Sequence, residues 1–206
     1  MFGMEFLICM TAFLDLLKER IVVFDGAMGS NLQALDLSID DWGGPNFENC
    51  SENLLYTRPD AIETVHRSFL DVGCDVIETN SFGGSEVVLA EFGIADKTYD
   101  VNKKAAELAK RLASDYSTYD KPRFVAGSIG PGTKLPTLGH ITYPALKEAY
   151  REQVRGLIDG GSDILIVETC QDLLQTKAAL AAIFFFFLKN KIKLPVIAQV
   201  TIEVFG

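Results

Sequence analysis

The sequence predicts an α/β protein built around a parallel β-sheet, and three observations carry this prediction. Short runs rich in valine and isoleucine alternate with segments in which apolar residues recur at helical spacing. The runs are apolar at consecutive positions, which is typical of strands that are buried on both faces of a parallel sheet. Two of the units also repeat one pattern of helix end, turn and strand. Such units favour β/α architecture over a β-sandwich.

Five strands are predicted from the apolar runs. They are Ile21–Gly26, Asp75–Phe82, Arg123–Gly130, Asp163–Cys170 and Pro195–Glu203. Five strands joined by helices fit either an open doubly wound sheet or an incomplete (β/α)8 barrel. A complete barrel takes about 250 residues, whereas this chain has 206. A barrel would therefore contain about five of its eight strands.

Helical periodicity connects the strands. Ile62, Val65 and Phe69 recur at helical spacing after Pro59, a residue that fits the first turn of a helix. The segment from Leu146 to Ile158 shows the same spacing before the fourth strand. Four consecutive phenylalanines at 184–187 would cover all faces of a helix, and we interpret them as a buried helix end.

Composition and charge exclude several classes of partner. With 48% hydrophobic and 23% charged residues, the chain has the balance of a soluble globular protein. A formal charge of −9 without a cluster of lysine or arginine argues against nucleic acid. Glu5 and Asp15 interrupt the apolar N-terminus, so we expect a lead-in helix over residues 1–20 and no membrane segment. Residues 21–206 then form one barrel unit.

The four cysteines indicate neither a zinc knuckle nor a disulfide framework. Cys9, Cys50, Cys74 and Cys170 lie far apart and form no C-x-x-C pair. A reducing cytoplasm is the simplest location for such a chain.

Two predicted strands end in residues that can carry chemistry. The motif FDGAMGSN places Asp25, Gly26 and Ala27 at the carboxyl end of the first strand, the edge where β/α folds position their sites. The alternative is a tight turn in which Asp25 caps the next helix. The fourth strand ends in ILIVETCQD, where Glu168 can bind an amine or act as a base. Its alternative is a carboxylate bonded to neighbouring turn amides.

The repeat relates two of these strand ends. The segments FLDVGCDVIETN and LIDGGSDILIVETC share a turn, a strand and a terminal Glu-Thr, so Glu78 and Glu168 are expected to point the same way. Cys170 is expected on the same side of the strand as Glu168, as a packing residue rather than a metal ligand. His66 is expected to be a solvated or half-buried helix residue.

Two glycine-containing segments lie near the same edge. Residues 40–54 form a long polar loop, which is either functional or a flexible surface insertion. GSIGPGTK is not a phosphate loop because Thr133 precedes Lys134, so we interpret it as a strand-ending turn.

Four motifs, taken in order, resemble the homocysteine S-methyltransferase family. They are FDGAMGSN, VHRSFLDVGCDVIETNSFGG, VAGSIGPGT and GGSDILIVETCQDLLQTKAAL, and the resemblance runs from about Ile21 to Glu203. They are most similar to the N-terminal homocysteine-binding module of cobalamin-dependent methionine synthases. The resemblance implies a TIM barrel, here incomplete, in which zinc holds homocysteine as a thiolate that accepts a methyl group from methylcobalamin on another module, giving methionine.

The resemblance also implies roles for individual residues. It places the substrate ammonium and carboxylate against the DG turn, and the ammonium against Glu168. Asn80, at the end of the second strand, is implied as a pocket-lining residue. The DG turn comprises Asp25, Gly26 and Ala27.

The family binds zinc through cysteines of a G-x-N-C and a G-G-C-C-G motif, and the chain contains neither. No metal ligand is therefore assigned here, and the zinc ligands are expected beyond Gly206. The fragment alone is expected to be inactive and poorly soluble, because its first and fifth strands would be open edges.

The resemblance implies a cytoplasmic parent enzyme whose partners are homocysteine and its own cobalamin- and folate-binding modules. Two alternatives stay open: a homocysteine methyltransferase that uses betaine or S-methylmethionine, and a non-catalytic remnant that acts as a binding module. A barrel aldolase is less favoured because no strand ends on a lysine.

Overall fold

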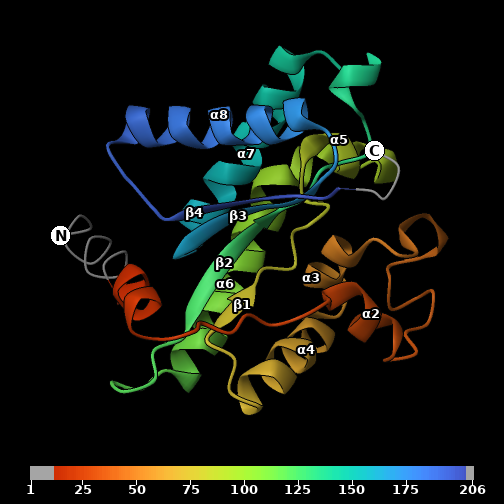
Figure 1. Cartoon of the computed structure of the whole chain (residues 1–206). Helices are drawn as coiled ribbons and strands as arrows, with labels where there is room; N and C mark the ends of the chain where they lie inside the picture. Colours follow the sequence, from red (N-terminus) through yellow and green to blue (C-terminus); the bar gives the residue numbers. More distant parts are fainter. Residues whose placement is uncertain (1–11, 203–206) are drawn as a thin grey trace.

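The strands of the sheet follow one another in chain order. The computed structural model describes residues 12–202, in which β1 (Val76–Glu78), β2 (Phe124–Ile129), β3 (Ile164–Cys170) and β4 (Val196–Val200) are neighbours in the order β1-β2-β3-β4 (Figure 1). All three pairings are parallel. A doubly wound sheet reverses its strand order, whereas a barrel keeps it sequential. The observed order therefore supports the incomplete barrel.

The first predicted strand forms only one bridge. Phe24 pairs in parallel with Val76, and the backbone N–H of Asp25 donates to the carbonyl of Val76 at 2.9 Å. The side of this segment away from β1 has no strand neighbour among residues 12–202, and Val23 is 53% exposed. The prediction of a full strand over Ile21–Gly26 is therefore wrong in length but right in position.

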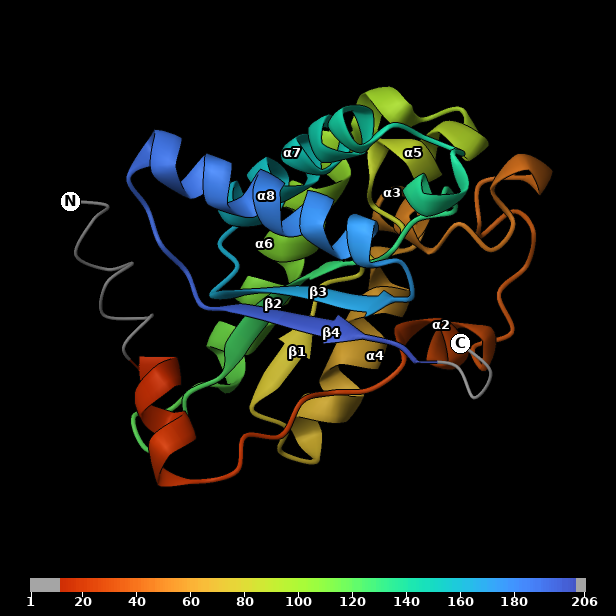
Figure 2. The ribbon, with the colours of Figure 1, turned by 45° about the horizontal axis from the view of Figure 1, so that its top comes forward.

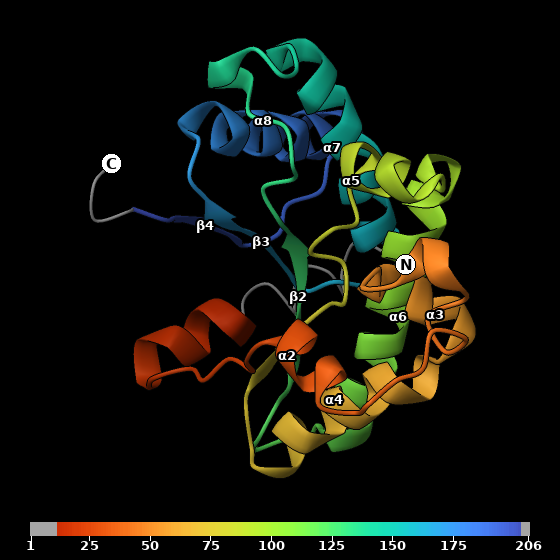
Figure 3. The same ribbon diagram turned by 90° about the vertical axis from the view of Figure 1, so that its right-hand side faces the viewer.

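Four long helices cover one face of the sheet. They are α4 (Pro59–Asp71), α6 (Thr98–Tyr116), α7 (Tyr143–Asp159) and α8 (Leu173–Asn190), and they follow the curve of the strands (Figure 3). The two helices predicted from periodicity are confirmed, with Pro59 in the first turn of α4. The connections contain α2 (Met28–Gln33), α3 (Leu54–Thr57), α5 (Glu86–Leu89) and the 3-10 turns Pro45–Phe47, Ser51–Asn53, Ala90–Phe92, Ala95–Lys97 and Pro136–Leu138.

Alternation along the strands divides the core into an outer and an inner layer. Leu165 and Val167 of β3 pack outward against α7 and α8, whereas Ile166 faces inward. The inner layer also contains Phe13, whose ring meets Phe124 edge-to-face at 5.5 Å between centroids. Phe13 belongs to the helical residues 12–19, which lie across the sheet from α7 and α8 (Figure 2). The rest of the expected lead-in helix, residues 1–11, lies outside the described residues.

The end of α8 carries the four phenylalanines. Phe187 is 6% exposed and packs in the outer core, but Phe184 and Phe185 are 50% and 47% exposed. The predicted buried helix end is therefore only partly confirmed, because consecutive residues point in different directions around a helix. By length and composition alone α8 could cross a membrane, yet here it packs on β3 and α7 as one helix of the outer layer.

The long polar loop at residues 40–54 is packed rather than a flexible insertion. Trp42 and Cys50 are buried in one apolar cluster with Ile62 of α4. The side-chain amide of Asn53 donates to the Trp42 carbonyl at 2.8 Å. These contacts hold the loop against α4.

Candidate active site at the carboxyl ends of the strands

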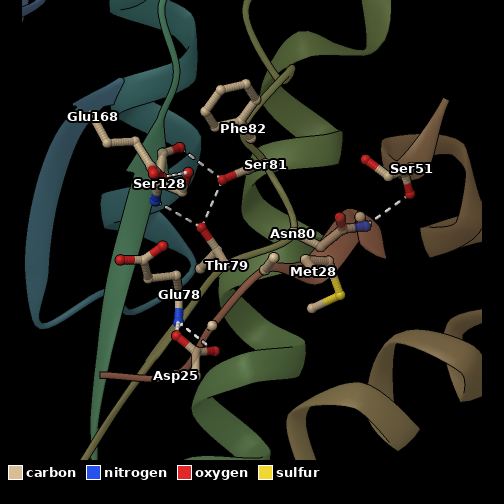
Figure 4. Close-up of a pocket in the computed structure, with 13 residues that line it drawn as sticks. Asp25, Met28, Ser51, Glu78, Thr79, Asn80, Ser81, Phe82, Ser128 and Glu168 are labelled. Carbon is tan, nitrogen blue, oxygen red and sulfur yellow. Dashed lines mark hydrogen bonds between the residues drawn. The ribbon is translucent and has the colours of Figure 1, made fainter. Parts of the chain in front are cut away.

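A pocket of about 380 Å³ opens at the carboxyl ends of the strands (Figure 4). The DG turn forms one side of it, and residues that end or follow β1, β2 and β3 form the rest. All five residues expected at a substrate site line this pocket, although their binding roles stay predictions. They are Asp25, Gly26, Ala27, Asn80 and Glu168.

Glu168 is held by a hydrogen-bond network that joins three strand ends. The hydroxyl of Ser128 donates to Glu168 Oε1 at 2.6 Å. Ser128 is itself fixed, because its N–H donates to the Thr79 hydroxyl at 2.9 Å and its carbonyl accepts from the Ser81 hydroxyl at 2.8 Å. The Glu168 carboxylate is therefore aimed into the pocket by a residue of the neighbouring strand β2, and no turn amide of residues 12–202 is seen to donate to it.

A β-bulge follows Glu168 and redirects the chain. The β3–β4 register shifts between Val167 and Cys170, and Thr169 has a left-handed φ of 58°. Because the bulge inserts an extra residue, Cys170 points to the outer core and is 0% exposed. The expectation that Cys170 shares the side of Glu168 is wrong for this reason, while its role in packing is confirmed.

Asp25 bonds to β1 and does not cap the next helix. Both carboxylate oxygens accept from the Glu78 N–H, at 3.0 and 3.1 Å. The N-cap of α2 is Ala27, and no side chain caps that helix. The capping alternative is therefore wrong. Burial and the nearby carboxylates of Glu78 and Glu168 raise the pKa of Asp25 to about 8.

Glu78 is a pocket residue that sequence reasoning did not include among the site residues. It is the last residue of β1 and lines the pocket together with Glu168, which confirms the expectation that the two point the same way. Burial, and then the charge of Glu168, raise the pKa of Glu78 to about 7. The repeated Glu-Thr was the signal that could have identified it.

The pocket wall also includes part of the long loop. The side-chain amide of Asn80 donates to the Ser51 carbonyl at 2.7 Å. The next residue, Glu52, is 4% exposed and accepts from the Gly83 N–H at 2.6 Å. Asn80 therefore ties the end of β1 to the loop as well as facing the pocket.

The charge of the pocket is one-sided. Its described lining includes the carboxyl groups of Asp25, Glu78 and Glu168 and contains neither lysine nor arginine. Carboxylates collected at a partly enclosed site favour a cationic group such as an ammonium.

Comparisons with known proteins agree with this geometry. The family model of homocysteine S-methyltransferase matches residues 22–204. The chain belongs to the homocysteine S-methyltransferase family. It is 46% identical over 196 residues to a methionine synthase of Mycobacterium tuberculosis and 45% identical to that of Mycobacterium leprae, covering 95% of this chain. The chain spans 16% of the length of either relative.

Solved structures show the same fold. The homocysteine methyltransferase MmuM from Escherichia coli, in its metallated form, superposes with a TM-score of 0.71 and 23% sequence identity over 92% of this chain and 65% of that one. Its oxidized form gives a TM-score of 0.69. The prediction of a homocysteine S-methyltransferase barrel, incomplete in this chain, is therefore confirmed.

The residues described here do not fit the zinc ion that the family resemblance implied. Within residues 12–202 no group of three His, Cys, Asp or Glu side chains could hold a metal ion. Cys50, Cys74 and Cys170 are buried outside the pocket lining, and burial raises the pKa of Cys50 to about 11 and of Cys74 to about 12. None of the three thiols therefore lies where it could join a metal ligand set at the pocket. Cys9 lies outside the described residues.

Proposed function

We propose that this chain is the homocysteine-binding part of an enzyme that methylates homocysteine to methionine. The observation that carries the proposal is the acidic pocket at the strand ends, in which Glu168 is held ready by Ser128. In this assignment Glu168 meets the substrate ammonium. The backbone amides of the turn at Gly26 and Ala27 receive the substrate carboxylate.

The narrow DG turn supports this assignment. A Cβ at Gly26 would lie 3.3 Å from the Phe69 ring, so a larger residue would push on α4 and move the turn. Glycine lets the backbone approach a ligand closely at this position. An amino acid that is held by its ammonium and by its carboxylate would have its side chain directed out of the pocket, toward the methyl donor.

The rest of the reaction is proposed to depend on parts outside these residues. The zinc ligands are proposed to lie beyond Gly206, and no step of the reaction is assigned here to a metal. Similarity to methionine synthases that are much longer than this chain supports methylcobalamin as the donor, with cobalamin- and folate-binding modules as partners. A cytoplasmic location belongs to the same proposal.

Substitution of Glu168 tests the proposal. In the full-length protein, Glu168→Ala is expected to weaken L-homocysteine binding by about 30-fold, since an ammonium would lose its charged partner at a cost of about 2 kcal/mol. Titration calorimetry measures the affinity. Glu168→Gln, which keeps an acceptor for Ser128, is the matched control and should lose affinity without losing the fold.

Zinc content provides the second readout. Glu168→Ala should leave it unchanged, because the proposed role is in gripping the amino acid. Equal loss of zinc and homocysteine binding would make Glu168 a structural residue. A wild-type protein that binds no homocysteine would overturn the proposed function itself.

A further inference from the structure

A fully buried histidine lies behind the pocket. His66 of α4 is 0% exposed, so the expectation of a solvated or half-buried residue is wrong. Neither ring nitrogen has a hydrogen-bond partner among residues 12–202. An unsatisfied buried polar atom destabilises the folded protein. A group retained at that cost points to a role other than packing.

The imidazole is aimed at the carboxyl group of Asp25. His66 Nδ1 lies 3.9 Å from Asp25 Oδ2, and both side chains are almost completely buried. This distance is too long for a hydrogen bond. The Asp25 carboxyl group keeps unused acceptor positions, because its bonds from the Glu78 N–H leave lone pairs free.

Burial changes the charge states of both groups. Burial lowers the pKa of His66 to about 4, while burial, Glu78 and Glu168 raise that of Asp25 to about 8. At neutral pH both are uncharged. Within residues 12–202 the Cys74 thiol, in the turn before β1, also lies near Asp25, and burial and then the charge of Asp25 raise the pKa of this thiol.

An ammonium in the pocket would change this balance. Its positive charge favours the ionised form of Asp25, which releases its proton to solvent. An ionised carboxylate forms shorter and stronger hydrogen bonds with an N–H donor than a neutral carboxyl group does. His66 is the unpartnered donor that lies within a small movement of Asp25 Oδ2.

We propose that His66 is the positioning residue for Asp25: when the ammonium of an amino acid enters the pocket, the Nδ1–H of His66 closes onto Asp25 Oδ2 and fixes the carboxylate. His66 does not touch the ligand. The inference rests on the proposed function and deepens it, because it assigns Asp25 to the amino-acid ammonium and names the group that orients it.

The test uses L-methionine as the probe in the full-length protein. Methionine carries the same ammonium and carboxylate as homocysteine but no titrating thiol. Calorimetric titrations from pH 6 to 9 are compared for wild type and His66→Leu. Leucine removes the N–H and both unsatisfied nitrogens, so the melting temperature should stay the same or rise while affinity falls about tenfold. The midpoint of the pH profile should move upward, since Asp25 loses a donor that favours its ionised form.

Two amide variants separate positioning from packing. In His66→Asn the amide N–H can occupy the place of Nδ1, so this variant should recover affinity and the wild-type pH midpoint. His66→Gln carries its amide one carbon further out, near the place of Nε2, and should not. If leucine lowers the melting temperature too far for binding to be measured, equal affinities of the two amide variants would overturn the inference.

The outcomes also distinguish the inference from the proposed function. A wild-type protein that does not bind methionine contradicts the proposed function. A wild-type protein that binds, together with a His66→Leu variant of equal affinity and unchanged pH profile, overturns the role of His66 alone. A fall in melting temperature without any shift of the pH midpoint makes His66 structural and overturns the role as well.

Discussion

The two repeated units, residues 69–80 and 157–170, begin alike and end differently. In each, an aspartate before the strand accepts a hydrogen bond from a backbone N–H of the neighbouring strand, at 2.9 Å: Val23 to Asp75 and Val125 to Asp163. The two carboxylates therefore stabilise the sheet by accepting these hydrogen bonds. Both copies of the turn have the same residue in the same contact.

The carboxyl ends of the two units lie at the pocket, and there the two units differ. Thr79 is 3% exposed and its hydroxyl accepts from the Ser128 N–H, whereas Thr169 is exposed in a bulge with left-handed φ. Glu168 accepts from the Ser128 hydroxyl, whereas no side chain within residues 12–202 donates a hydrogen bond to the Glu78 carboxyl group. The two units are thus alike in the turn that supports the sheet, and they differ in the Glu-Thr end that lies at the pocket.

Removal of the turn carboxylates should have the largest effect on stability. Asp163→Ala leaves the Val125 N–H and the Lys110 ammonium without their acceptor. We expect the free energy of unfolding to fall by about 3 kcal/mol. Urea denaturation measures the change.

Asp75→Ala should cost a similar amount, since Asp75 accepts from Val23 and pairs with Arg20. The exposed Asp120 provides the control, and Asp120→Ala should change stability by no more than about 0.5 kcal/mol. A strong effect at one aspartate and none at the other would break the equivalence of the two turns.

Glu78→Gln should stabilise the protein in a pH-dependent manner. Burial raises the pKa of Glu78 from 4.5 to about 7. Between these values the unfolded chain ionises and the folded one does not, so stability is lost as pH rises toward 7. The amide removes this loss, and we expect a gain of about 2 kcal/mol at pH 8 and none at pH 4.

Denaturation curves at pH 4, 6 and 8 measure this effect. Glu107→Gln, at a site 54% exposed on α6, is the matched control and should show no such trend. A gain at pH 4 equal to that at pH 8 would contradict the ionisation argument.

Thr169→Gly should have the smallest effect. Glycine relieves the left-handed conformation, which costs about 1–2 kcal/mol for other residues, but adds freedom to the unfolded chain. A net gain of about 0.5 kcal/mol is therefore expected. Thr79→Gly should instead destabilise, because it removes the acceptor of the Ser128 N–H. Thermal unfolding of both variants measures the difference between the two threonines. A loss of stability in Thr169→Gly would contradict the prediction and show that the Thr169 side chain stabilises the fold.

The sequence by itself determined the parallel sheet, the positions of the strands and five of the residues that line the pocket. Valine and isoleucine runs, helical spacing and the ordered motifs are local features, and they identified Asp25, Asn80 and Glu168 as residues at one edge. The family followed from those motifs and is confirmed by the match over residues 22–204.

Only the tertiary structure decided the contacts between distant segments. The sequential strand order, the bulge that turns Cys170 away from Glu168, and the complete burial of His66 behind Asp25 depend on which elements pack together. The alternation of a strand predicts sides only while its register is unbroken. The surroundings of a helix residue are set by segments that lie far away in the chain, and for this reason His66 became visible as a partner of Asp25 only in the folded protein.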